Sequence, residues 1–137
     1  MKQGEVFNIS KAKCLVRLPL EMVKDRSVSY TAKVLYGLMV KYAGSVGYFS
    51  HSQERIARDM GVSIDMIRKA VQALKRKKYI LVKGGGHGNP SIYYFLWRKE
   101  FTSLPGIDHV IKLDPKLHKK IIAEQKKHPG RVVPFIS

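Results

Sequence analysis

The stretch from Phe49 to Ile80, FSHSQERIARDMGVSIDMIRKAVQALKRKKYI, decides the fold. It contains two amphipathic segments, residues 51–60 and 64–78, with Gly61 between them. In the second segment the apolar residues recur at helical spacing: Ile67, Ala70, Val71 and Leu74. This spacing puts them on one face of a helix, and glycine takes a positive φ at low cost. The stretch therefore predicts two short helices joined by a tight turn.

Serine residues mark the expected starts of these two helices. Ser50 and Gln53 have the spacing of a capping box, which predicts that the helix over 51–60 begins after Ser50. Ser63 directly precedes the helix over 64–78 and is its expected N-cap.

Further elements are expected on both sides. Ser29 precedes an apolar stripe at i, i+3, i+4 and i+7, which predicts a helix over 30–43. Downstream, residues 79–97 read as a β-hairpin whose tip is GGGHGNP, residues 84–90. A basic helix over 115–127 is expected to begin at an Asp-Pro pair.

The order helix, helix-turn-helix, hairpin is that of a winged helix. The expected fold class is mainly α with a small β-hairpin (α+β), a winged helix-turn-helix with N- and C-terminal extensions. We place the N-terminal extension at 1–28, the winged helix-turn-helix domain at 29–98, and a C-terminal basic extension at 99–137.

Charge points to a polyanionic partner. The 137 residues hold 26 Lys and Arg against 10 Asp and Glu, a formal net charge of +16. The densest block is residues 64–83, with seven bases and Asp65 as its one acid. The chain has no apolar run near 18 residues, the first ten residues lack the apolar core of a signal peptide, and Cys14 is the single cysteine. We therefore expect a cytoplasmic, nucleoid-associated protein and no membrane partner.

Two stretches of the sequence resemble known protein families. The run from Phe49 to Ile80 is similar to winged helix-turn-helix proteins, and the motif positions are Ser50, Ile56-Ala57, Gly61-Val62-Ser63, Ile67, Val71, Leu74 and Tyr79-Ile80. Upstream, VRLPLEMVKDRSVSYTAKVLYGLM resembles plasmid and phage replication-initiation proteins through Pro19 and the stretch from Ser29 to Lys33. The resemblance covers roughly residues 15–97 and implies that the helix over 64–78 enters the major groove of DNA.

The expected DNA contacts are the residues of this helix and of the wing that the core does not need: Ser63, Asp65, Met66, Arg68, Lys69, Gln72, Lys75, Arg76, Lys83, His87 and Asn89. Arg68 and Lys69 suit guanine edges or phosphates, and Gln72 suits adenine. Asp65 either accepts from cytosine or favours the helix N-terminus, the second reading being preferred. Ser63 is preferred as a cap over a base contact. Among the basic residues after Leu74, one or two are expected to contact phosphates.

The sequence contains no recognisable catalytic or metal-binding motif. The five histidines have no close pairing, one cysteine builds no zinc site, and the acids form no paired-carboxylate cluster. The glycine-rich tip lacks the lysine of a nucleotide-binding loop. We expect no enzyme, metal, cofactor or small-molecule substrate.

The preferred function is sequence-specific binding of double-stranded DNA, with helix 64–78 in the major groove, a wing at 83–90, and phosphate neutralisation by the basic flanks. Replication initiation or phage or plasmid regulation is the expected role, and a transcriptional regulator is an alternative. A protein–protein module is another, with residues 107–137 as a homodimer or replication-partner surface. RNA binding, which the charge and the aromatic residues favour, is a third.

Overall fold

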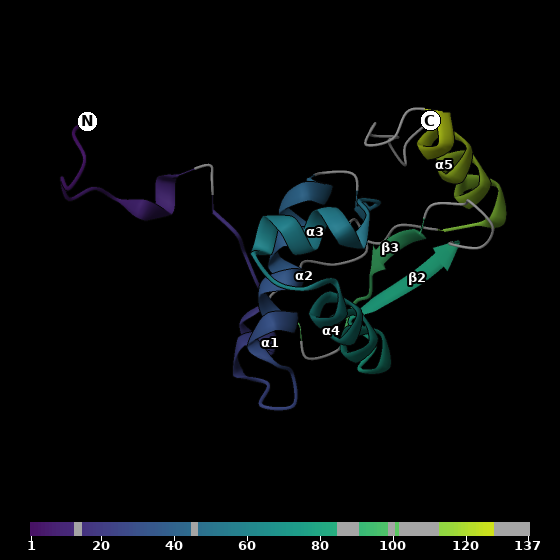
Figure 1. Ribbon diagram of the computed structural model, residues 1–137, viewed down its shortest axis with the longest axis horizontal. Helices are drawn as coiled ribbons and strands as arrows, with labels where there is room; N and C mark the ends of the chain where they lie inside the picture. The colour runs from purple at the N-terminus through teal and green to yellow at the C-terminus, as the bar shows by residue number, and fades with distance from the viewer. Residues whose placement is uncertain (13–14, 45–46, 85–90, 99–100, 102–112, 128–137) are drawn as a thin grey trace.

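The computed structural model describes residues 1–12, 15–44, 47–84, 91–98, 101 and 113–127 (Figure 1). Along the chain the elements are a 3-10 helix Ile9–Lys11, α1 Leu20–Lys24, α2 Tyr30–Ala43, β1 Tyr48–Phe49, α3 Gln53–Met60, α4 Ile64–Arg76, β2 Ile80–Gly84, β3 Ser91–Phe95 and α5 Pro115–Lys127. The protein is α+β, with helices and a small antiparallel sheet, as the sequence predicted.

The sheet has the strand order β1-β3-β2. β2 and β3 form the expected hairpin, with Leu81 opposite Tyr94. β1 was not expected and pairs with the other edge of β3, where Tyr48 lies opposite Tyr94 and Phe49 opposite Tyr93. The central strand is therefore β3, the segment with the strongest β signal in the sequence.

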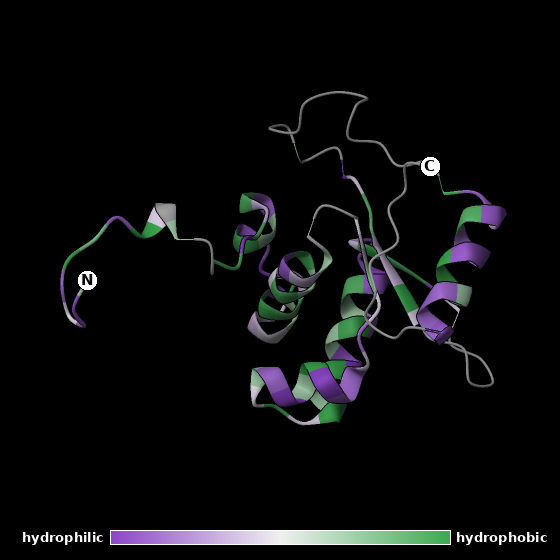
Figure 2. Cartoon of the chain, turned by 90° about the horizontal axis from the view of Figure 1, so that it is seen from above, coloured by the Kyte–Doolittle hydropathy of each residue, from purple (hydrophilic) through white to green (hydrophobic). Residues whose placement is uncertain are grey.

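The main core lies between α2, α3, α4 and one face of the sheet. Its fully buried side chains include Leu35, Met39, Ile56, Ile67, Leu74 and Ile80. Met22 of α1 and Val28, both within residues 1–28, belong to the same cluster, as does Phe101. Figure 2 shows that hydrophobic and hydrophilic residues alternate along these helices.

A second cluster covers the opposite face of the sheet. It consists of Tyr48, Ile92, Tyr94 and Ile121, the last of these from α5. α5 thus packs against the strands, and in Figure 1 it lies beside the end of β2. Leu117 and Ile122, on the same side of α5, pack partly against this cluster. Both faces of β3 are buried, which explains its continuous aromatic run.

The helix starts confirm two serine caps and correct a third. Ser29 accepts from the Ala32 N–H, and Ser63 accepts from the Met66 N–H, as expected. For α3 the prediction of Ser50 as the cap was wrong, because Ser52 accepts from the backbone N–H three residues on. The Ser50 hydroxyl instead donates to Gln125 Oε1 at 2.9 Å.

The end of α4 also differs from the prediction. The helix ends at Arg76 and not at residue 78, with Lys77 as C-cap and Lys78 at φ +62°. The Tyr79 N–H then donates to the Leu74 carbonyl at 3.0 Å. This reversal turns the Tyr79 ring, 2% exposed, into the core, and that burial favours ending the helix early.

Candidate nucleic-acid interface

A tight turn fixes the direction of α4 relative to α3. Gly61 has φ +67° and ψ +33°, the left-handed conformation that favours glycine. The Val62 N–H donates to the Ala57 carbonyl at 3.0 Å, which closes the end of α3. Ser63 then caps α4 within two residues of Gly61. The two helices are therefore joined with almost no freedom at the turn.

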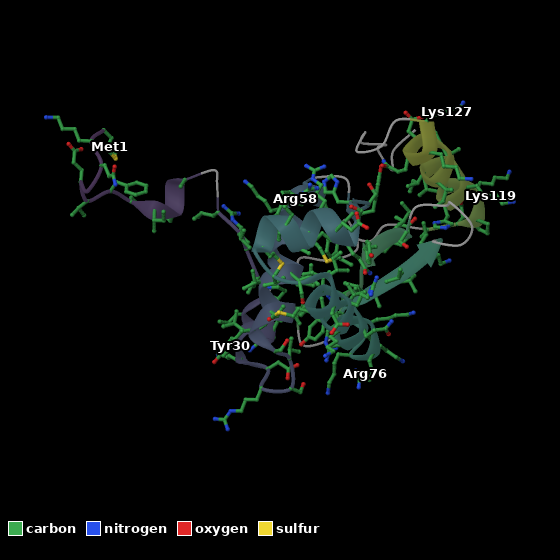
Figure 3. The ribbon with its side chains drawn as sticks, in the orientation of Figure 1. Met1, Tyr30, Arg58, Arg76, Lys119 and Lys127 are labelled. Carbon is green, nitrogen blue, oxygen red and sulfur yellow. The ribbon has the colours of Figure 1, made fainter. Side chains whose placement is uncertain are left out.

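α4 has one buried and one exposed face. Ile67, Ala70, Val71 and Leu74 are buried, as the spacing predicted. The exposed face holds most of the expected contact residues: Asp65, Met66, Arg68, Lys69, Gln72, Lys75 and Arg76. Arg76 lies at the far end of the helix in Figure 3. The structure thus places donors for phosphates and base edges along one side of a helix whose other side is fixed in the core.

Three expected contacts already have partners within the chain. Asp65 Oδ2 lies 3.3 Å from Lys69 Nζ, an i, i+4 ion pair between exposed side chains. Such a pair contributes about 0.5 kcal/mol or less, so DNA can break it at little cost. The Ser63 hydroxyl is used by the cap of α4. The preference for capping at Ser63 is therefore confirmed.

Arg68 lies at a cavity between the helices and the sheet. The cavity has a volume of about 420 Å³ and is lined by the start of α3, by Ile64 and Arg68 of α4, and by Ser91 and Tyr93 of β3. This wall could not be predicted from the sequence, because β3 and α4 come together only in the folded chain. Arg68 therefore lies between the exposed face of α4 and strand β3, so that one ligand could contact both elements.

His51, also in the wall of this cavity, is a packed side chain. Its ring meets Phe49 and Tyr42 edge to face, with centroids 5.0 and 5.1 Å apart. Burial, and then the charge of Arg55, lowers the pKa of His51 below its usual value. Arg55 Nη1 lies 3.3 Å from His51 Nδ1, a contact that the neutral ring accepts. His51 therefore serves the structure of the wall and adds no charge near neutral pH.

The wing is described only in its strands. Lys83 is exposed near the end of β2, where it lies opposite Ile92. His87 and Asn89 lie outside the described residues, as does most of the glycine-rich tip. The pKa of His118, in α5, is lowered first by burial and then by the positive charge of Lys83. Lys83 and the start of α5 are thus neighbours.

Within the described ranges, His, Cys, Asp and Glu form no group of three that could hold a metal ion. In the same part of the chain, no helix has the length and apolar character needed to cross a membrane.

Residues 29–80 match the model of a family described as "Helix-turn-helix domain". This segment is a helix-turn-helix domain. The matched residues begin at Ser29, the cap of α2, and end at Ile80, where β2 starts. The helix-turn-helix domain supports DNA binding as the general function of the chain. It takes in α2, α3 and α4, so β3 and α5 lie beyond it.

A solved structure is also similar. It is titled "N-Terminal domain of DNA binding protein", is 16% identical, covers 96% of this chain and 100% of its own, and has a TM-score of 0.48. A comparison with curated proteins finds no match.

Proposed function

We propose that the helix-turn-helix domain binds double-stranded DNA in a sequence-specific way, with α4 in the major groove. One observation carries the proposal: the exposed face of α4 bears Arg68, Lys69 and Gln72, the residue types that read guanine and adenine edges. The core holds the opposite face, so the helix can enter a groove without unfolding. Ser63 stays a cap, and Met66, 42% exposed, is available for contact with a thymine methyl group.

The remaining contacts in the proposal are to the DNA backbone. Lys75 and Arg76 at the end of α4, and Lys83 on β2, are exposed and positively charged. Such side chains neutralise phosphates whatever the sequence, while the wing tip, with His87 and Asn89, would approach the adjacent minor groove or backbone. If about 6–8 bases contact phosphates, log K falls with log salt at a slope of roughly −5 to −7. An affinity that does not depend on salt would contradict this mechanism.

The biological role that we propose is replication initiation or phage or plasmid regulation. Its support is the likeness of residues 16–39, which take in α1 and the first part of α2, to replication-initiation proteins. In this segment Lys33 is only 8% exposed, and its Nζ donates to the Val23 carbonyl at 2.8 Å. The motif lysine thus joins α1 to α2 and does not face a ligand. A transcriptional regulator would use the same α4, so the role depends on where the site lies and how it repeats.

The test begins with selection of duplexes from random oligonucleotides by the whole protein, followed by binding assays on the selected site. Arg68→Ala should weaken binding to that site by about 1–3 kcal/mol and relax its specificity. The matched control is Lys24→Ala, an exposed lysine on α1, which should bind as the wild type does. An equal loss on every sequence would make Arg68 a phosphate ligand and contradict base reading.

Selection also distinguishes the alternatives. Tandem direct repeats in the selected site favour an initiator, and a palindrome favours a dimeric regulator. Competition with duplex RNA tests the RNA-binding alternative, since preference for RNA would refute the proposal. The absence of any selected sequence would do the same.

A further inference from the structure

The outer face of α5 is made almost entirely of lysine. From residue 116 to the end of the helix, the exposed positions are Lys116, Lys119, Lys120, Ala123, Lys126 and Lys127. At 100° per residue these six positions fall within an arc of roughly 120°. Figure 3 labels Lys119 and Lys127 on the side of α5 that is turned away from the strands. Glu124, the acid of this helix, lies half-buried and outside the arc.

Contacts on the inner face hold α5 in a fixed orientation. Ile121 is completely buried against the sheet. The Tyr94 hydroxyl lies 2.7 Å from His118 Nδ1, and two helical turns later Gln125 accepts from Ser50 at 2.9 Å. A hydrophobic contact flanked by two polar contacts prevents the helix from rolling. The lysine face is therefore presented in one direction.

The two ends of α5 lie beside the two parts of the proposed DNA surface. At its start, His118 is close enough to Lys83 of the wing to feel its charge. Toward its end, Gln125 is bonded to Ser50, which lines the same cavity as Arg68 of α4. The helix thus runs along the edge of the surface that α4 and β2 form.

We propose that this lysine face is a second DNA-binding surface, which contacts the phosphate backbone beyond the wing and lengthens the bound stretch of duplex. The proposal rests on the proposed function, because it assumes a duplex held by α4. From Lys116 to Lys127 the face is roughly 16 Å long. A duplex carries roughly nine phosphate charges over that length. A face of like charges repels itself, and a polyanion removes that repulsion.

The chemistry of the face favours backbone contact without base reading. Its side chains are lysines, which act as point charges, and it has no Arg, Asn or Gln that could form two hydrogen bonds with one base. A membrane surface fits less well, because a helix that lies on a bilayer needs a free apolar face. In α5 that face is already buried by Tyr94, Ile92 and Tyr48.

The experiment compares two triple variants of equal charge in the full chain. K116Q/K119Q/K120Q removes three charges from α5, and K2Q/K24Q/R26Q removes three from exposed residues near the N-terminus and at the end of α1. Each is titrated against a duplex that the wild type binds, at several salt concentrations. In the α5 variant, the slope of log K against log salt concentration should become less steep by roughly 2–3. At 0.1 M salt it should then weaken binding on the order of 10²-fold, while the control changes little.

Two further measurements complete the test. Hydroxyl-radical footprinting should show a shorter protected stretch for the α5 variant, lost on the wing side only. K116R/K119R/K120R should restore the footprint, because it restores the charge. If the Gln variant does not fold, as circular dichroism would show, lysine-labelling of the wild type replaces it: Lys119 and Lys120 should be protected by duplex and Lys24 should not.

The outcomes separate this proposal from the proposed function. If the wild type binds no duplex, both fail. If the wild type binds and Arg68→Ala weakens it, but the two triple variants behave alike, only the α5 proposal is overturned. It is also overturned if K116Q/K119Q/K120Q keeps its DNA footprint and instead loses binding to vesicles containing phosphatidylserine.

Discussion

The turn between α3 and α4 allows a quantitative test at Gly61. A Cβ built on Gly61 would meet no heavy atom within 4 Å, so Gly61→Ala creates no clash. The cost is then only that of holding an L-residue at φ +67°, about 1–2 kcal/mol. Alanine also restricts the unfolded chain, which offsets about 0.4–1 kcal/mol. We therefore expect a net loss of about 1 kcal/mol.

Thermal and urea unfolding of Gly61→Ala and Gly61→Asn check this value. For a chain of 137 residues, 1 kcal/mol corresponds to a fall in Tm of roughly 3–4 °C. Asparagine tolerates the left-handed conformation, so Gly61→Asn should lose about half as much. A loss above about 3 kcal/mol would show that side chains do not fit at the turn. Equal stability of wild type and both variants would show that the turn is not left-handed.

Three other perturbations test the core and the packing of the helices. Leu74→Ala should lower the free energy of unfolding by about 2–5 kcal/mol, because this side chain is completely buried, and an unchanged urea midpoint would refute the helix phase. Lys33→Met should lower the free energy of unfolding by about 1–2 kcal/mol, because it removes the hydrogen bond to the Val23 carbonyl. The control Lys24→Met changes an exposed lysine and should lower it by under about 0.5 kcal/mol. Equal losses in the two variants would contradict the link between α1 and α2. Burial, and then the charge of Lys83, lowers the pKa of His118 in the folded protein below 6.5. The contribution of the neutral ring to the free energy of unfolding is therefore fully present above pH 6.5, and it is lost as the pH falls toward the pKa of the folded protein. Melting curves from pH 8 to 5 should show a smaller decline for His118→Asn, and parallel curves would contradict this role.

Local signals were enough for the helix-turn-helix. Ser29 and Ser63 cap helices through a backbone N–H three residues away, and Gly61 ends α3 within the same few residues. The buried face of α4 followed from spacing alone, because a regular helix fixes which residues share a face. The hairpin was predicted for the same reason, since its two strands are neighbours in the sequence.

The sequence-based predictions were wrong or incomplete where a contact with a residue distant in the sequence determined the local structure. Ser50 has the spacing of a cap, yet its hydroxyl bonds to Gln125, 75 residues away, and Ser52 caps α3. β1 is only two residues long, too short for alternation to be read, and exists because it pairs with β3. α4 ends early because Tyr79 turns into the core.

The sequence by itself determined the helix-turn-helix, the basic exposed face of α4 and the amphipathic character of the helix over 115–127. Only the tertiary structure decided that this helix covers the second face of the sheet, bonded to Ser50 and Tyr94. The physical reason is the range of the interactions. Periodicity and capping act within a few residues, whereas docking depends on an apolar sheet face assembled from three separate strands. The direction of the lysine face, and with it the proposed second DNA surface, follows from that docking.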